Sequence, residues 1–361
     1  MDFGLSEEQT LLQTTLRRYL EAECRPTRVR EVMESETAHD SGLWRGLAGL
    51  GVTGLMVPTE LGGSGLELLD LALAADELGR SSTPGPFLGN AMATIALLEG
   101  EASARERWLP AVATGEAVLS FALGEGIGEW DAERLETRFQ GGKLDGTKPL
   151  VPFAEVADAI LVAARGPEGP GIWAVDRGAP GVTSTPLTGN DLTRRVSHVR
   201  FEGTPASPVA SGRAAIDRVR DAGLVLLAAD ASGGAHRCLE MTVQYALTRE
   251  QFGQVIGAFQ GVKHQLANIA TDLEPAVSLW WYAAHAYDHI REKSERHAAL
   301  AKAHLTDLYD TTVRYAIELH GGIGFTWEYD LHLWFRRALF DRAFLGEASY
   351  HRQRAADLAG W

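Results

Sequence analysis

Four long segments with a helical repeat of apolar residues fill the chain from about residue 211 to its end, and they restrict its fold more than any other feature. The segments span residues 214–247, 257–291, 295–319 and 331–358. Apolar residues that recur at this period form one buried face of a helix, and segments of this length are typical of helical bundles. The sequence therefore predicts a C-terminal helical bundle.

The first part of the chain is also helical in pattern, and the middle is not. Apolar residues at helical spacing occur at Leu12, Leu16 and Leu20. Near Ala117 the pattern changes to short apolar or alternating runs, at residues 118–123, 135–139, 159–164, 171–175, 182–187 and 196–201. Turn sequences separate these runs, as at Gly141-Gly142 and Asp145-Gly146, so we expect a small antiparallel sheet, a barrel or a sandwich.

These patterns predict an α+β protein of three domains. An N-terminal helical domain would span residues 1–117, a middle β domain residues 118–208, and a C-terminal four-helix bundle residues 209–361. A chain of 361 residues is long enough to bury a core in each of them.

Composition and charge exclude several classes of function. The formal net charge of -14 argues against nucleic acid, which requires a basic surface. No apolar run approaches the roughly 20 residues of a membrane span, and the acidic N-terminus does not resemble a signal peptide. Cys24 and Cys238 suggest no disulfide framework, and His285 and His289 lack a third metal ligand. We expect a cytoplasmic protein that holds no metal.

Two motifs indicate a site for a large anionic ligand. The first is Arg249-Glu-Gln-Phe-Gly253, followed by Phe259-Gln260. A guanidinium carries a planar fork of donors that suits a phosphate. Because the whole chain would repel an anion, such a site needs local cations, and Lys263, Arg336 and Arg337 are further candidates.

The second motif is glycine-rich and follows an apolar helical stretch at residues 305–319. Gly321, Gly322 and Gly324 lie in the segment that begins at His320. Glycines often end a helix, but two in succession exceed what a cap requires. Their bare backbone would let a ligand approach closely. Together, the two motifs predict a cofactor site.

The stretches that carry these motifs, residues 245–260 and 319–330, resemble the flavin-binding signature of the acyl-CoA dehydrogenase family. Similarity continues at residues 57–65, 77–80 and 141–148, so it covers nearly the whole chain in the family's order. The likeness is greatest to the actinobacterial branch that oxidises steroid-derived CoA thioesters, whose members often pair as unlike subunits. It implies the cofactor FAD and the family's order of helical, β and helical domains.

The resemblance also implies roles for single residues. Arg249 would contact the diphosphate of the FAD bound by an adjoining subunit, and Gln260 would lie near its adenosine end. Gly321 and Gly322 would lie against the adenine-diphosphate part. Phe252 and Phe259 complete this group, with Phe252 expected to pack rather than react. Glu318 departs from the family, which has glutamine there. This departure matters because a carboxylate repels a diphosphate unless it turns away.

The flavin-ring half of the signature is poorly preserved. The family offers a Thr-Glu-Pro turn, and then a tryptophan and a threonine after a Gly-x-Lys turn. This chain has Leu123-Gly-Glu-Gly126 and Lys148-Pro-Leu-Val-Pro-Phe153 instead. Gly124 has no hydroxyl, and Pro149 and Pro152 have no backbone N–H. Either the backbone alone holds the ring, or the ring pocket of this chain is degenerate.

The reaction of the family needs a carboxylate base, and Glu347 is the candidate. It would take a proton from the carbon next to the thioester carbonyl while a hydride leaves the following carbon. Its spacing from Gly322 is about two residues longer than usual in the family. Other members carry the base at the position of Gly223, which has no carboxylate. The alternative for Glu347 is a solvated helix residue near Arg342 or His351.

The predicted function is α,β-dehydrogenation of an acyl-CoA, with electrons passed to an electron-transfer flavoprotein. The likeness implies an unlike second subunit in an α2β2 assembly, or else a homotetramer. Two alternatives stay open. In the first, the chain is a non-catalytic companion subunit that provides flavin contacts to its partner. In the second, it is a flavin oxidase or monooxygenase, and oxygen consumption would reveal that activity.

Overall fold

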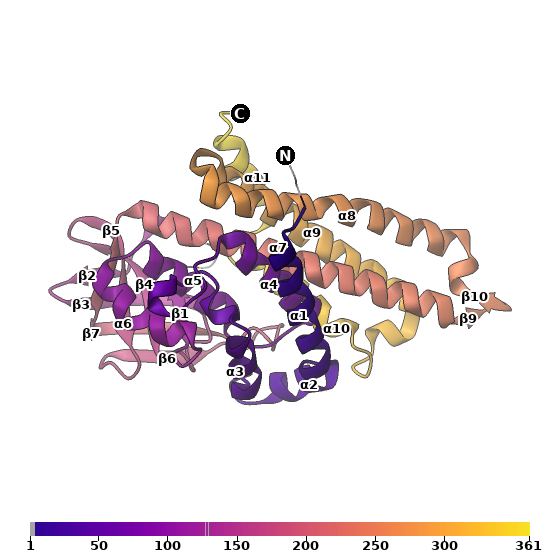
Figure 1. Ribbon diagram of the computed structural model, residues 1–361, viewed down its shortest axis with the longest axis horizontal. Coiled ribbons are helices and arrows are strands. Elements are labelled where there is room, and N and C mark those ends of the chain that lie inside the picture. Colours follow the sequence, from indigo (N-terminus) through magenta and orange to yellow (C-terminus); the bar gives the residue numbers. More distant parts are fainter. Residues whose placement is uncertain (1–3, 127, 129) are drawn as a thin grey trace. The chain divides into compact units, whose positions relative to one another are not determined.

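The computed structural model describes residues 4–126, 128 and 130–361 (Figure 1). Helices run as far as Ala113, strands occupy the chain from Leu119 to Ser211, and helices return at Arg213. This order confirms the predicted fold class. By contacts the chain separates into two compact units. One holds the described residues up to Val29 with Ala72–Thr83 and Val225–Trp361, and the other holds Arg30–Leu71 and Pro84–Leu224.

The first unit is helical and contains most of the predicted bundle. Its long helices are the later part of α7 (Arg213–Thr248), α8 (Gln260–His289) and α9 (Arg291–His320). Between α7 and α8 lie a short hairpin, β9 (Glu250–Gln251) and β10 (Gln254–Val255), and the turn η4 (Ile256–Ala258), as Figure 1 shows. Helix α1 (Glu7–Glu23) begins in a capping box, in which Ser6 and Gln9 satisfy each other's backbone N–H groups.

The last predicted segment, residues 331–358, is not one helix. It divides into α10 (Leu331–Ala343) and α11 (Ala348–Asp357), and η5 (Gly321–Phe325) precedes them. The break occurs where Leu345 has φ +61° and Gly346 has φ +108°, values that no α-helix contains. An apolar period carries no information about such a corner, so the prediction of a continuous helix was wrong.

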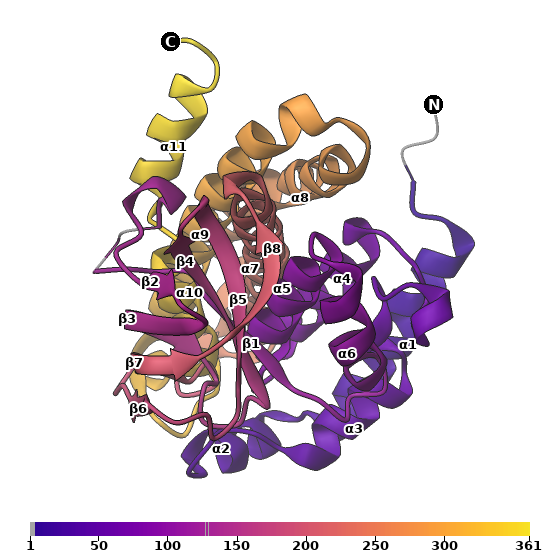
Figure 2. The same cartoon turned by 90° about the vertical axis from the view of Figure 1, so that its left-hand side faces the viewer.

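The strands of the second unit form one eight-stranded sheet (Figure 2). Its order is β6-β7-β3-β2-β4-β5-β8, with β1 paired to β4. The strands are β1 (Leu119–Ala122), β2 (Arg138–Gln140), β3 (Lys143–Pro152), β4 (Ala159–Gly166), β5 (Gly169–Asp176), β6 (Val182–Pro186), β7 (Val196–Pro205) and β8 (Ser207–Ser211). Most pairs are antiparallel, as predicted, but β1 and β2 each run parallel to β4.

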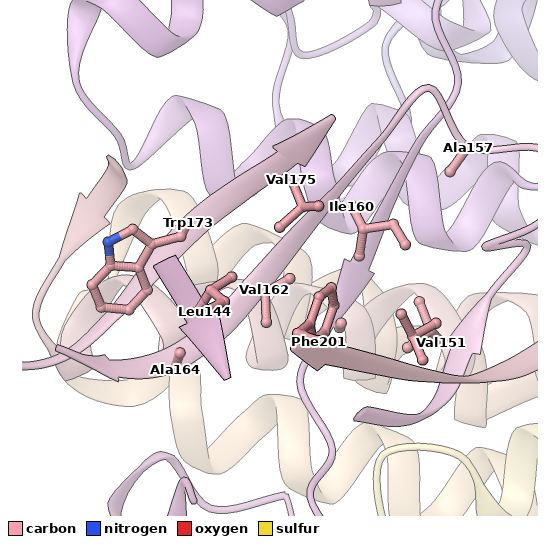
Figure 3. Packing of buried hydrophobic residues seen from close by; sticks show 11 residues of the cluster. Leu144, Val151, Ala157, Ile160, Val162, Ala164, Trp173, Val175 and Phe201 are labelled. Atoms are coloured by element: carbon pink, nitrogen blue, oxygen red, sulfur yellow. The ribbon is translucent and has the colours of Figure 1, made fainter. Parts of the chain in front are cut away.

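A cluster of buried apolar side chains joins the strands of this sheet (Figure 3). Leu144 and Val151 of β3, Val162 of β4, Trp173 of β5 and Phe201 of β7 belong to it. Strands from across the width of the sheet thus contribute side chains to one cluster, and β6 and β8 are the ends of the strand order. The short predicted runs correspond to real strands because each supplies inward-facing residues to this core.

Strand β3 corrects one predicted turn. Gly141 and Gly142 do form the hairpin turn between β2 and β3, both with positive φ. Asp145-Gly146 instead lies within β3, where the pairing with β7 shifts by a residue. A second shift, between Lys148 and Val151, accommodates the proline that a regular central strand excludes.

Helices complete the second unit. They are α2 (Pro26–Glu34, from Arg30 onward), α3 (Ser41–Gly49), the first residues of α4 (Leu68–Arg80), α5 (Phe87–Leu98), α6 (Ala102–Ala113) and the first part of α7, with the turns η1 (Val52–Gly54), η2 (Thr59–Leu61) and η3 (Ala132–Arg134). Every residue of α5 except Leu98 is buried, which explains its almost wholly apolar sequence. Among the described helices none combines the length and apolarity that a membrane crossing requires.

Candidate functional site

Arg249 lies at the end of α7, where the helix gives way to the β9–β10 hairpin. Its side chain is exposed, and in the described part of the chain it pairs with no carboxylate. The neighbouring Glu250 is the first residue of β9 and does not neutralise it. The backbone is fixed on both sides, because Arg249 N–H donates to Tyr245 and its carbonyl accepts from Ile256 N–H, both at 2.8 Å. A fixed backbone that carries an unpaired guanidinium suits an anion that comes from outside this chain.

The aromatic residues of the same motif are largely solvent-facing. Phe252 lies at the hairpin tip with φ +54° and is 91% exposed. Its only described ring contact is edge-on to Phe259, with 6.1 Å between ring centroids. The expectation that Phe252 packs is therefore not met within one chain. Gln260, the first residue of α8, is exposed as well.

The glycine motif forms the end of α9. Gly321 has φ +63° and caps the helix, its N–H donating to the carbonyl of Glu318. A Cβ added to Gly321 or Gly322 would meet nothing within 4 Å, so open space lies over this backbone. Gly324 differs, since its Cβ would lie 2.6 Å from the carbonyl oxygen of Ile317. Gly324 therefore serves the helix end, while Gly321 and Gly322 leave room for a ligand. Glu318 is exposed to solvent.

A stacked cluster joins the two motifs, and it was not predicted. The rings of Tyr245 and His320 stack with centroids 4.2 Å apart, and His320 Nε2 lies 2.9 Å from the hydroxyl of Tyr329. Burial lowers the pKa of His320. Tyr245 lies one helical turn before Arg249, and its hydroxyl contacts the carbonyl of His320 at 3.4 Å. An aromatic residue one turn before the arginine was the signal that could have revealed this contact.

A cavity of about 330 Å³ lies along the same face of α7. Its lining runs from Arg237 to Thr248, the residue before Arg249, and includes Tyr329. An exposed cation, uncovered glycine backbone and adjacent space are what a diphosphate needs. This half of the site fits the dinucleotide part of FAD. Of the other predicted cations, Arg337 is unavailable, because it is fully buried and bonded to Asp230 and to the carbonyl of Thr83.

The flavin-ring half, in the β domain, does not fit. Lys148 is fully buried, and its ammonium donates to Glu125 and to the carbonyl of Leu123 at 3.1 Å. Glu125 also accepts from the backbone N–H and the hydroxyl of Thr137, at 3.2 and 3.3 Å. Burial lowers the pKa of Lys148 to about 8, which the charge of Glu125 partly opposes. The polar groups of this turn are thus used within the domain.

Space at the same turn is filled. A Cβ on Gly124 would lie 2.9 Å from Cζ3 of the buried Trp130, so the hydroxyl-bearing residue of the family could not be accommodated without movement. Beyond Lys148, Leu150 and Phe153 have φ of +56° and +46°, and Phe153 is buried. Of the two alternatives for the ring, the geometry favours a degenerate pocket.

Glu347 is exposed and precedes α11 as its N-cap residue. It lies outside the helix, and Arg342 does not pair with it, because that guanidinium is held by Asp307 at 2.9 Å. The corner behind Glu347 is firmly held. Buried Lys302 donates to the carbonyls of Arg342, at 2.7 Å, and of Gly346. Burial lowers the pKa of Lys302 to about 7.

His351 holds the same corner from the other side, with Nε2 2.9 Å from the carbonyl oxygen of Leu345. The position of Glu347 is therefore well defined. Its assignment as the base stays a prediction, as do the roles of the other proposed site residues. In the described part of the chain no group of three metal-ligating side chains gathers.

Comparison with known proteins agrees with this architecture. Residues 6–116 match the acyl-CoA dehydrogenase N-terminal domain, and residues 212–359 match the acyl-CoA dehydrogenase C-terminal domain. Acyl-CoA dehydrogenase IpdE2 of Mycobacterium tuberculosis is 33% identical over 334 residues, covering 92% of this chain and 91% of that protein.

Solved structures show the same relation over nearly the full length. A variant of the Tcur3481–Tcur3483 steroid acyl-CoA dehydrogenase has a TM-score of 0.92 at 33% identity, covering 98% of each chain. The ChsE4–ChsE5 complex from Mycobacterium tuberculosis has a TM-score of 0.90 at 28% identity, covering 100% of this chain and 99% of that one. The chain belongs to the acyl-CoA dehydrogenase family of enzymes, whose cofactor is FAD.

Proposed function

We propose that this chain is one subunit of an oligomeric FAD-dependent acyl-CoA dehydrogenase, in which it supplies the dinucleotide-binding surface for a flavin held by an unlike neighbouring subunit. The assembly would introduce an α,β double bond into a CoA thioester in the cytoplasm and pass the electrons to an electron-transfer flavoprotein. When bound, FAD supplies the hydride acceptor.

The observation that carries this proposal is the contrast around Arg249. Its guanidinium is exposed and unpaired in the described chain, and the backbone of Gly321 and Gly322 is open, while the ring half of the same chain is filled by Trp130 and by the Lys148–Glu125 pair. A chain that keeps only the outward-facing half can serve a neighbour's cofactor. Two solved relatives are named as pairs of different chains, which supports an unlike partner.

The relatives also support a substrate class. One similar structure is named a steroid acyl-CoA dehydrogenase. We therefore propose a CoA thioester with a bulky steroid-derived acyl group, in preference to a straight fatty chain.

The alternative proposal is that the chain is itself catalytic, with Glu347 as the base. Its carboxylate is exposed on a corner that Lys302 and His351 hold in place. A carboxylate so presented is able to take the α-proton of a thioester whose carbonyl is polarised in a site that excludes water. On this alternative the chain is a catalytic subunit, and glutamine at 347 removes the proton acceptor.

Co-expression with a dehydrogenase-like partner tests the main proposal. We expect the chain to purify colourless alone and to gain flavin absorbance only in the complex. Arg249→Gln in the complex should weaken FAD binding about tenfold or more, the loss expected for a charge-assisted hydrogen bond. Arg291→Gln, an exposed arginine at the start of α9, is the matched control and should leave flavin content unchanged. A chain that carries one FAD by itself contradicts the proposal.

Turnover of the complex separates the two roles. If Glu347 is the base, Glu347→Gln should lower the rate by roughly 10²–10⁴-fold with FAD still bound. Full activity in that variant places the base on the partner. Oxygen consumption without the electron-transfer flavoprotein would indicate an oxidase instead.

A further inference from the structure

The helical unit contains a second cavity, separate from the one that leads to Arg249. Its volume is also about 330 Å³, and its wall is built from α1, the start of α2, the end of α4, α7 and α10. The lining residues are Arg17, Leu20, Glu21, Cys24, Arg25, Pro26, Arg80, Ser81, Arg237 and Trp334. It shares only Arg237 with the first cavity.

Two of its arginines are held in place from behind. Arg17 donates to Glu77 through Nε and Nη2, at 3.0 and 2.6 Å, and Glu77 is fully buried. Arg80 donates to Glu240 through Nη2. A guanidinium has five N–H donors, so each retains donors that no acceptor in the described chain takes. Bonding to Glu77 also raises the pKa of Arg17. The guanidinium groups of Arg17 and Arg80 are therefore held in fixed directions.

The other two arginines are less constrained. Arg237 lies 3.6 Å from Glu240, too far for a good hydrogen bond. Arg25 is exposed and has no side-chain partner among the described residues. A ligand that enters the cavity therefore meets two fixed guanidinium groups and two that can adjust.

The local charge is close to neutral, whereas the chain as a whole is acidic. Four guanidinium groups line the cavity, against the carboxylates of Glu21 in the wall and of Glu77 and Glu240 behind it. Buried Asp76 also lies near Arg17 and Arg80, and burial raises its pKa to about 7. The formal net charge of the chain is -14. Because the field of the whole chain repels anions, only a ligand that reaches these donors directly is favoured.

The floor of the cavity is apolar. Leu20, Cys24 and Trp334 are all at most 3% exposed. The ring of Trp334 is fixed, since its Nε1 donates to the carbonyls of Gly79 and Arg80 at 3.2 Å. Above this buried floor, Pro26 and the aliphatic stems of the arginines give the cavity an accessible apolar lining. A bare inorganic ion would satisfy the arginines and leave that lining in water. An anion with a compact apolar body would satisfy both.

We propose that this cavity is a binding site for a small organic oxyanion, a carboxylate or a phosphate monoester attached to a flat apolar group. The oxyanion is bound by the free donors of Arg17, Arg80 and Arg25, and the apolar group lies against Pro26 and the arginine stems, above the buried Leu20 and Trp334. The site lies wholly within one helical unit. Its wall shares only Arg237 with the cavity near Arg249, and the proposal does not rest on the function proposed above.

Ligand titration of the full-length protein, alone or in its complex, tests this. The probes are 1-naphthoate, 1-naphthyl phosphate and the neutral 1-naphthalenemethanol, followed by calorimetry or by ligand-observed NMR. At least one anion should bind about tenfold or more tightly than the alcohol, since a charge-assisted hydrogen bond contributes roughly 1.5–3 kcal/mol. The better of the two anions identifies the head group.

Variants locate the binding. Arg25→Gln removes a cavity donor that supports no described ion pair, and it should weaken anion binding about tenfold. Arg18→Gln is the control, because Arg18 is an exposed arginine of α1 that does not line the cavity, so this substitution should have no effect. Equal binding of the neutral alcohol, equal effects of the two substitutions, or no binding of either anion at millimolar concentration would each overturn the proposal.

Discussion

The two halves of the expected flavin site have opposite characters. In the β domain the polar groups of the ring half bond to one another, as Lys148 does to Glu125, and Trp130 fills the space over Gly124. In the helical unit Arg249 is exposed, and open space lies over Gly321 and Gly322. The polar groups of the first half satisfy one another, and the cation and glycine backbone of the second face open space.

This difference shows which part of a shared site a subunit can lose. A buried lysine needs a compensating carboxylate, because an unpaired charge in the interior is strongly unfavourable. Once Lys148 and Glu125 satisfy each other, the turn needs no flavin to be stable. Arg249 carries no such requirement, since water solvates it in the free chain. The surface proposed to serve a neighbour can therefore persist independently of the pocket that would serve the chain itself.

The largest expected effect is that of breaking the buried pair. Glu125→Leu leaves Lys148 buried without a counter-charge, and we expect the free energy of unfolding of the β domain to fall by about 3–5 kcal/mol. Denaturant midpoints followed by tryptophan fluorescence measure it. Glu202→Leu removes one partner of the exposed Arg200–Glu202 pair on β7, and it should change stability by less than about 1 kcal/mol.

Two further results sharpen this test. Glu125→Leu with Lys148→Met replaces both charges by apolar groups and should recover most of the loss. The single variant should also gain stability as the pH rises. Burial already lowers the pKa of Lys148 from 10.5 to about 8. Between these two pH values the unfolded chain binds more protons than the folded chain, so stability increases with pH. Without the charge of Glu125, which raises the pKa of Lys148, this increase should begin at a lower pH in the variant. A β domain indifferent to Glu125→Leu would remove the basis of the comparison.

The next effect comes from the space at Gly124. Gly124→Ala places a Cβ 2.9 Å from the ring of Trp130, and we expect a loss of about 1–3 kcal/mol from overpacking. Gly126→Ala is matched to it, because a Cβ there meets nothing within 4 Å, and its effect should stay within about 1 kcal/mol. Equal effects of the two substitutions would mean that Trp130 does not close the ring half.

Much of the architecture followed from the sequence. The apolar period located α7, α8 and α9 to within a few residues, because each buries one continuous face. The paired glycines at 141 and 142 identified the hairpin between β2 and β3. Exposure of Arg249 and open backbone at Gly321 agree with the motifs, since these features depend on local sequence and on a helix end.

Features set by contacts between distant segments could not be predicted. The corner at Leu345 depends on Lys302 of α9 and His351 of α11, which no periodic pattern connects. Trp130 closes the space over Gly124 within one irregular connection, where no apolar period applies. The arginines of the second cavity come from α1, the α1–α2 connection, α4 and α7, so their proximity exists only in the folded chain.

The smallest expected effect is at the tip of the β9–β10 hairpin, close to Arg249 in the chain. Phe252 is 91% exposed and contacts Phe259 only edge-on, so Phe252→Ser should change the thermal stability of the isolated chain by no more than about 0.5 kcal/mol. In the complex the same change should weaken assembly, because a large exposed aromatic residue is an effective interface anchor. Sedimentation measures assembly, and a thermal melt measures the chain alone. If the isolated chain loses stability instead, the hairpin belongs to the fold, and the helical unit would no longer differ from the β domain in the way described.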